Sequence, residues 1–261
     1  MVINMNSAML YYYNLKEILK TLPQNHIQSM DLSDDNIFNY ATFSDLGSFY
    51  KRIFRIDKYK LDQKLKDEHF YDFLKETIYI FMKTASPNQL LLIYAMLAHY
   101  ILEKDVNEYL SPRISKLDTF NLLSLKIDRY YSKIYDEIDL NKQSIYSIFP
   151  NAFKYTKEMN DLIAHPFVKI YSFFNTNNYF KRAMKNKKRH YKHHFKHLQM
   201  DLNVLNLDNE PYTVDGIEYN YSLNEIIANS RNKALEQIKI IDAYIFDKKD
   251  KEFNELFNIK E

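Results

Sequence analysis

SPNQLLLIYAMLAHYILE, at residues 86–103, is the stretch that decides the fold. Ser86 and Gln89 have the spacing of a capping box, and Pro87 stands at the first helical position, so the pattern predicts a helix start. From Gln89 to Glu103 the chain is apolar on nearly every side of a helix. Such a helix is usually central and buried, and we therefore expect a helical core built around this segment.

Helical patterns recur on both sides of this segment. Ser222 and Glu225 form a second capping-box pattern, which predicts that another helix starts there. Further helices are expected at about 6–21, 61–83, 117–138, 155–174 and 178–198. The helix at 117–138 would bury one stripe: Phe120, Leu123, Ile127, Tyr130 and Ile134.

Two segments are expected to lie outside these helices. Residues 201–221 hold Pro211 and Gly216 and are expected to form a long loop. The end of the chain, residues 247–261, is expected to be either a short polar helix or a frayed tail. The predicted fold class is all-α, a multi-helix bundle in which residues 1–261 form a single domain.

The composition excludes several other classes of protein. The chain has 261 residues with only 2 Gly, too few for the turns of a β-rich fold or for a glycine-rich phosphate loop. It has no Cys, which excludes disulfides and thiolate metal sites. The formal net charge of +2 does not by itself imply a nucleic-acid partner. Residues 1–20 lack the basic-then-apolar order of a secretion signal. The most apolar stretch, Leu90 to Leu102, is too short to span a bilayer. A cytoplasmic location is therefore the expectation.

His99 and Glu103 carry the most informative polar pattern. They are four residues apart and share one face of the expected central helix, which Asn107 extends by another turn. A histidine inside an apolar helix needs a polar partner, because burying an unpaired polar group costs about 1–3 kcal/mol. Two interpretations remain open at this point: His99 and Glu103 form a structural pair, or both hold a metal ion.

A family resemblance extends this pattern. Residues 97–110, LAHYILEKDVNEYL, resemble the motif H-Y-x-L-D-x-x-x-H-P-Y of the bacterial zinc-dependent phospholipase C family. His99 matches the first histidine of the motif, and Glu103 replaces its aspartate. Asn107 stands where the motif has its second histidine.

Other motifs of the family follow in the same order along the chain. Residues 41–50, ATFSDLGSFY, resemble the stretch that supplies a metal-bridging carboxylate, which would be Asp45. Lys66 lies nearest the place of a further ligand histidine, and His69 is out of register. Residues 120–129, FNLLSLKIDR, keep the final Ile-Asp-Arg of the motif H-x-x-x-E-x-x-I-D-R but have Phe120 and Ser124 in place of its ligands.

The resemblance implies an all-helical fold shared with single-strand-specific zinc nucleases. It also implies hydrolysis of a phospholipid or another phosphodiester, with zinc activating water. Asp45, His99 and Glu103 are the matched ligands, enough for one zinc ion but not for a cluster. No catalytic residue is assigned. The alternative is a non-catalytic binding or scaffold protein that retains the fold.

A second candidate site lies in the basic segment at residues 182–197, RAMKNKKRHYKHHFKH. Its candidate binding residues are Lys188, Arg189, His190, His193, His194 and His197. A solvated basic helix is one interpretation, and contact with an anionic surface such as phospholipid headgroups is another. A nucleic-acid partner is less favoured than either the hydrolase or the non-catalytic scaffold, because the net charge of the chain is close to neutral.

Overall fold

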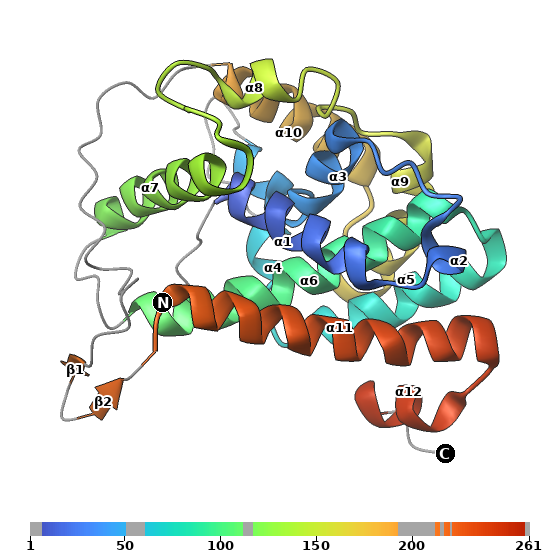
Figure 1. Ribbon diagram of the computed structural model, residues 1–261. Coiled ribbons are helices and arrows are strands. Elements are labelled where there is room, and N and C mark those ends of the chain that lie inside the picture. Colours follow the sequence, from blue (N-terminus) through green and yellow to red (C-terminus); the bar gives the residue numbers. More distant parts are fainter. Residues whose placement is uncertain are drawn as a thin grey trace.

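The computed structural model describes residues 7–50, 61–111, 117–192, 212–214, 217–219 and 221–258. Figure 1 shows an assembly of helices with one small hairpin, which confirms the predicted all-α fold class. The helices before residue 112 are α1 (Ala8–Thr21), α2 (Gln24–Ile27), α3 (Asp34–Ala41), η1 (Ser44–Phe49), α4 (Leu61–Lys64), α5 (Phe70–Thr84) and α6 (Pro87–Leu110). Those after it are α7 (Leu117–Asp136), α8 (Ile145–Ile148), α9 (Lys157–Tyr171), α10 (Thr176–Tyr191), α11 (Leu223–Asp247) and α12 (Asp250–Leu256).

Helix α6 is the central helix that the sequence predicts. It runs through the middle of the molecule, with α11 lying along it and α1 and α3 packed on another side (Figure 1). Its residues from Gln89 to Ala98 are all buried, which explains why this helix shows no polar face over that length. The helix continues to Leu110, about two turns beyond the expected end, because Val106, Tyr109 and Leu110 are also buried.

The start of α6 differs from the predicted capping box. Pro87 occupies the first turn as expected, but the Ser86 side chain makes no capping hydrogen bond. The Gln89 side chain turns away from the helix end: its amide nitrogen donates to the Glu158 carbonyl at 3.1 Å, and its oxygen accepts from Thr84. The capping box at Ser86 was therefore wrong, since a tertiary contact with α9 competes for the same amide.

The predicted helix at 61–83 is interrupted. The structure has α4 and α5 with a link of five residues between them. In this link Asp67 Oδ1 accepts from the backbone nitrogen of His69 at 2.9 Å, and the Tyr171 hydroxyl donates to the Lys64 carbonyl at 2.5 Å. These bonds replace helical hydrogen bonds, so that the link can direct Lys66 inward.

The C-terminal part of the chain follows the predicted pattern with two differences. The Ser222–Glu225 capping box is formed at the start of α11. Within the expected loop 201–221, however, β1 (Tyr212–Val214) and β2 (Ile217–Tyr219) pair as an antiparallel hairpin. On α7, Ile134 was expected in the buried stripe but is 56% exposed.

The last described helix, α12, packs under the end of α11 (Figure 1). Its Phe253 is buried and stacks on Tyr244 with 3.8 Å between ring centroids. Of the two alternatives for these residues, the structure has the helix. Among the described residues, no helix is both long enough and apolar enough to span a membrane.

Asp128, from the Ile-Asp-Arg segment, has a structural role at the start of α1. Its Oδ1 accepts hydrogen bonds from the backbone nitrogens of Met9 at 2.9 Å and Leu10 at 3.4 Å. The first turn of a helix has unsatisfied N–H groups, and the N-cap residue Ser7 does not satisfy them with its side chain. A carboxylate from α7 thus caps α1 and fixes the two helices together.

Candidate metal centre

The three candidate metal ligands come together in the core. Asp45 lies in the 3₁₀ turn η1, while His99 and Glu103 lie one turn apart on α6, and all three are buried. One ligand atom from each lies within 4.8 Å of the other two. The three residues that the family resemblance matches to metal ligands thus lie together, and this group could hold one metal ion.

The spacing of these atoms is compatible with a metal ion. His99 Nε2 lies 3.4 Å from Asp45 Oδ1 and 3.3 Å from Glu103 Oε2. Two atoms that each lie about 2.1 Å from a tetrahedral zinc ion are separated by about 3.4 Å. Neither His99 Nε2 nor Glu103 Oε2 makes a well-aligned hydrogen bond, although both atoms are buried and lie 3.3 Å apart as an ion-pair contact. Buried polar atoms without partners are rare, and they are what a ligand ion or an ordered water would satisfy.

The orientation of His99 is fixed by its other ring nitrogen. His99 Nδ1 lies 2.9 Å from the Ala41 carbonyl oxygen, which can only accept, so Nδ1 carries the hydrogen. Tyr11 stacks on the imidazole with 3.8 Å between ring centroids. These contacts direct Nε2 toward the two carboxylates, the arrangement that metal-binding histidines commonly use.

The space between the carboxylates already receives a cation from the protein itself. Lys66 Nζ donates to Asp45 Oδ1 at 2.7 Å and to Glu103 Oε1 at 2.6 Å. The Lys66 side chain is only 6% exposed. Sequence reasoning placed Lys66 near the position of a missing ligand histidine and did not predict that it would join the site. The lysine ammonium shares Asp45 Oδ1 with any metal ion, so the two would compete.

The protonation of the cluster follows from its geometry. Burial opposes the charge of Lys66, but the carboxylates of Asp45 and Glu103 raise the pKa of Lys66 above its usual value. Burial likewise opposes the imidazolium of His99, yet the same two carboxylates raise its pKa to about 9. For Asp45, burial is outweighed by Lys66 and His99, which hold the pKa of its carboxyl below the usual value. At neutral pH Lys66 and His99 are therefore cations, and Asp45 is a carboxylate.

A second buried lysine supports the same turn. Lys187 on α10 is 1% exposed, and its Nζ donates to the carbonyl oxygen and the hydroxyl of Thr42, at 2.9 and 2.5 Å. Among the described residues no carboxylate contacts this ammonium, and burial lowers the pKa of Lys187 to about 7 despite the nearby charge of Asp45. Residues 41–45 are thus held by side chains from α6, from α10 and from the α4–α5 link. Nothing in the sequence distinguishes Lys187 from the basic run around it, for which a solvated helix was one interpretation.

The remaining positions of the family motifs do not build a second metal site among the described side chains. Asn107 Oδ1 continues the face of His99 and Glu103, and it is buried without a hydrogen-bond partner. Ser124 is buried, and its backbone carbonyl accepts from the Ser7 hydroxyl at 3.2 Å. The side chain of Phe120 lies outside the described residues.

Unlike Lys187, none of the described candidate binding residues of the basic segment is buried. Lys188 Nζ lies 5.2 Å from the centre of the Tyr146 ring, and Arg189 is exposed. His190 is exposed and lies beside Phe49, with 5.3 Å between ring centroids. The other candidates of this segment lie outside the described residues: His193, His194 and His197.

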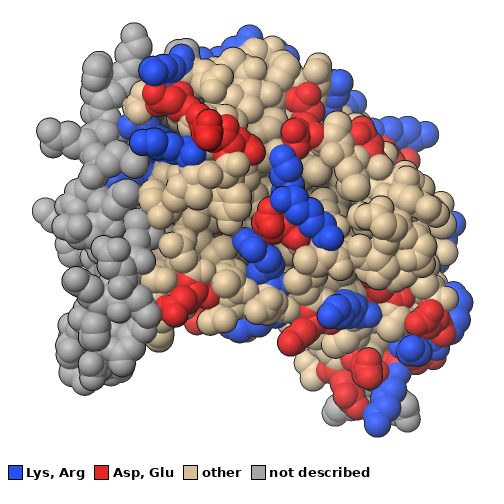
Figure 2. All heavy atoms as spheres, in the orientation of Figure 1, with Lys and Arg blue, Asp and Glu red and all other residues tan. Residues whose placement is uncertain are grey.

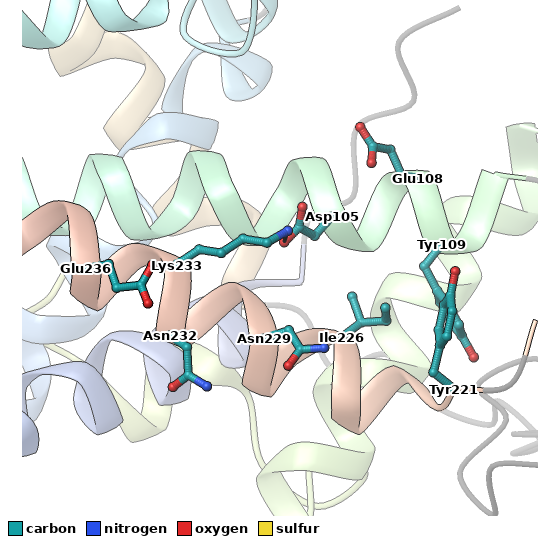
Figure 3. Close-up of a pocket in the computed structure, with 9 residues that line it drawn as sticks. All are labelled: Asp105, Glu108, Tyr109, Tyr221, Ile226, Asn229, Asn232, Lys233 and Glu236. Carbon is teal, nitrogen blue, oxygen red and sulfur yellow. Dashed lines mark hydrogen bonds and ion pairs between the residues drawn. The ribbon is translucent and has the colours of Figure 1, made fainter. Parts of the chain in front are cut away.

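A surface pocket of about 560 Å³ lies between α6 and α11 (Figure 3). At its centre Asp105 Oδ2 accepts from Lys233 Nζ and from the Ser230 hydroxyl, each at 2.8 Å. Tyr109 and Tyr221 close one end of the pocket (Figure 3). None of the cluster residues lines it, since residues 103 and 105 project from different sides of α6. No pattern in the sequence indicates this pocket.

Comparisons with known proteins identify no relative of this chain. No protein-family model, no curated protein and no solved structure matches this chain.

Proposed function

We propose that this chain is a non-catalytic binding or scaffold protein, in which the ammonium of Lys66 takes the place of a divalent cation. The observation that carries the proposal is the pair of hydrogen bonds from Lys66 Nζ to Asp45 and Glu103, at 2.7 and 2.6 Å. Metal catalysis needs an ion with an open coordination position. A tethered ammonium compensates the two carboxylates without offering such a position.

The charge balance supports this proposal. A carboxylate pair in the core is tolerated only if a cation neutralises it. Lys66 and the protonated His99 provide two positive charges at the site, and Asp45 and Glu103 provide two negative ones. The charges of the four side chains then sum to zero without a bound ion. The role of the cluster is to fix η1 and the α4–α5 link against α6.

The second candidate is a zinc-dependent, phospholipase C-like phosphodiester hydrolase. It is favoured by the unsatisfied His99 Nε2 and Glu103 Oε2 atoms and by their spacing, which suits a tetrahedral ion. In this case Asp45, His99 and Glu103 hold one zinc ion once Lys66 has moved away. The zinc ion would lower the pKa of a bound water and so supply a hydroxide nucleophile.

Metal analysis distinguishes the two candidates. The protein is purified without chelator, and its zinc content is measured by mass spectrometry for wild type, Lys66→Ala and the double variant Lys66→Ala/His99→Ala. We expect far less than one zinc per chain in the wild type, since Lys66 competes for Asp45. Lys66→Ala is expected to take up about one zinc ion per chain and the double variant none. His69→Ala, which removes an exposed neighbouring histidine, is the control.

The opposite result would favour the hydrolase. One tightly held zinc per wild-type chain, together with cleavage of a phosphodiester substrate that His99→Ala abolishes without unfolding the protein, would refute the non-catalytic proposal. Lys66→Met serves as a second variant if Lys66→Ala does not fold, because it keeps most of the side-chain volume while removing the charge.

A further inference from the structure

Residues 162–200 form a long stretch without any acidic residue. They contain nine lysines and arginines, whereas the whole chain has nearly equal numbers of acidic and basic residues. Figure 2 shows how basic and acidic side chains mix over the face of the molecule that is drawn in Figure 1. The stretch around α10 therefore departs from the charge pattern of the rest of the sequence. Lys169 pairs with Glu76 at 2.7 Å, so the excess positive charge lies mainly on α10 itself.

Helix α10 divides into two faces. The inner face is buried and includes Tyr179, Phe180, Ala183, Met184 and Tyr191. The outer face carries exposed basic side chains at helical spacing: Lys181, Arg182, Lys185, Arg189 and Lys192. In the part of the chain that the structure describes, none of these five forms an ion pair with a carboxylate. This outer face is thus a stripe of cations held in place by a well-packed helix.

Basic side chains of α10 lie over two aromatic rings, those of Tyr50 and Tyr146. Arg182 lies 5.5 Å from the centre of the Tyr50 ring, and Lys188 and Lys192 lie 5.2 and 4.9 Å from the centre of the Tyr146 ring. Cation–π contacts of this kind cover the ring faces that would otherwise stack on nucleic-acid bases. The face is therefore better suited to a charged surface than to single-stranded nucleic acid.

An exposed aromatic residue lies at one end of the stripe. Phe174 directly precedes Asn175, the N-cap of α10, and is 79% exposed, the largest exposed fraction among the large apolar side chains of the described residues. An exposed phenylalanine costs solvation free energy unless a partner covers it. Aromatic residues next to basic residues are typical of surfaces that bind lipid headgroups and insert a ring among them.

We propose that the outer face of α10, together with Phe174, binds an anionic lipid surface. The stripe of cations contacts the headgroups, and Phe174 enters the boundary between headgroups and acyl chains. This inference does not depend on whether the buried cluster holds a metal, because Lys187, which bonds to Thr42 beside the cluster, lies on the buried face of α10. It also needs no transmembrane segment, since lipid contact is made in the plane of the interface.

Sedimentation with lipid vesicles tests the proposal. The full chain is mixed with vesicles of phosphatidylcholine alone and with vesicles containing about one third phosphatidylserine. We expect binding to the anionic vesicles only, weakening as salt is raised. The variant Lys181→Gln/Lys185→Gln/Arg189→Gln is expected to bind about 100-fold more weakly, because each basic residue near the surface contributes about 1 kcal/mol. Phe174→Ser is expected to bind about 10-fold more weakly.

The control carries the same change in charge elsewhere. Lys83, Lys133 and Lys251 are exposed on other helices, and replacing all three by Gln is expected to change binding far less than the α10 variant does. Equal binding to both kinds of vesicle, or equal loss in the two triple variants, would overturn the proposal. So would strong binding to a nucleic-acid oligonucleotide that the α10 variant abolishes, if no anionic vesicle is bound.

Discussion

Lys66 Nζ lies 2.6 Å from Glu103 Oε1, so a lysine from the link between α4 and α5 neutralises a carboxylate on the central helix. Both side chains are almost completely buried. Breaking such a pair leaves a charge in the core without a partner, which is more damaging than the loss of an exposed ion pair.

The first prediction concerns the stability of Lys66→Ala. Without metal this variant should lose about 3–5 kcal/mol of unfolding free energy, because Asp45 and Glu103 remain buried with His99 as their only cation. Urea unfolding in the presence of chelator measures the loss. Lys20→Ala is the comparison, since Lys20 forms an exposed pair with Glu17 at 2.6 Å and should lose about 1 kcal/mol or less. Similar losses in the two variants would contradict the buried role of Lys66.

The second prediction concerns the pH dependence of His99. The pKa of His99 is raised to about 9 in the folded protein, above the ordinary value of 6.5 that applies when unfolded. Its stabilising effect is therefore complete below pH 6.5 and is lost as the pH rises through 9. Relative to His99→Gln, the wild type should lose about 3 kcal/mol of unfolding free energy over this range in metal-free buffer. A constant difference between the two proteins would show that the imidazole is not charged.

The third prediction concerns Lys187, whose contribution to stability changes with pH in the opposite direction to that of His99. Burial lowers the pKa of Lys187 to about 7, below its ordinary value of 10.5, so the unfolded chain binds more protons between these values. Compared with Lys187→Met, the wild type should gain about 2 kcal/mol of stability between about pH 7 and pH 8.5. Urea unfolding of both proteins at several pH values measures the gain. A falling difference over this range would contradict a neutral amine at this position.

The fourth prediction concerns the cap of α1. Asp128→Ala removes the acceptor for the backbone nitrogens of Met9 and Leu10, and it should lower the unfolding free energy by about 0.5–2 kcal/mol. Hydrogen exchange at these two amides should become faster, while exchange in the middle of α6 should change only as far as global stability falls. Unchanged exchange at both amides would show that the cap does not protect them.

The sequence predicts the helices well where periodicity decides them and less well where tertiary contacts do. The apolar run of α6 and the Ser222 capping box need only local chemistry, so both could be predicted. The break after α4 could not, because residues 65–69 hold no Gly or Pro, and the contacts that stabilise the break come from Asp67 and from Tyr171 on α9. Gln89 was misassigned for a similar reason, since its amide bonds to α9.

The candidate site likewise combines features that spacing along the chain predicts with features that depend on tertiary contacts. Helical spacing places His99 and Glu103 on one face, and the family resemblance adds Asp45. The inward orientation of Lys66 depends on where the α4–α5 link lies in space, which spacing along the chain does not specify. Its only signal in the sequence was its position near a missing histidine. Lys187 gave no signal, since the neighbouring lysines in the same run point outward.

The turn at residues 41–45 also bears on how the protein folds. Its three buried contacts join residues that are 21, 58 and 145 positions apart along the chain, through Asp45 with Lys66, Ala41 with His99, and Thr42 with Lys187. Contacts of such long range require large loops to close before they can form, so this turn should be ordered late on the folding pathway. Its mutations should then act mainly by speeding unfolding, which would make the turn a determinant of the lifetime of the native state.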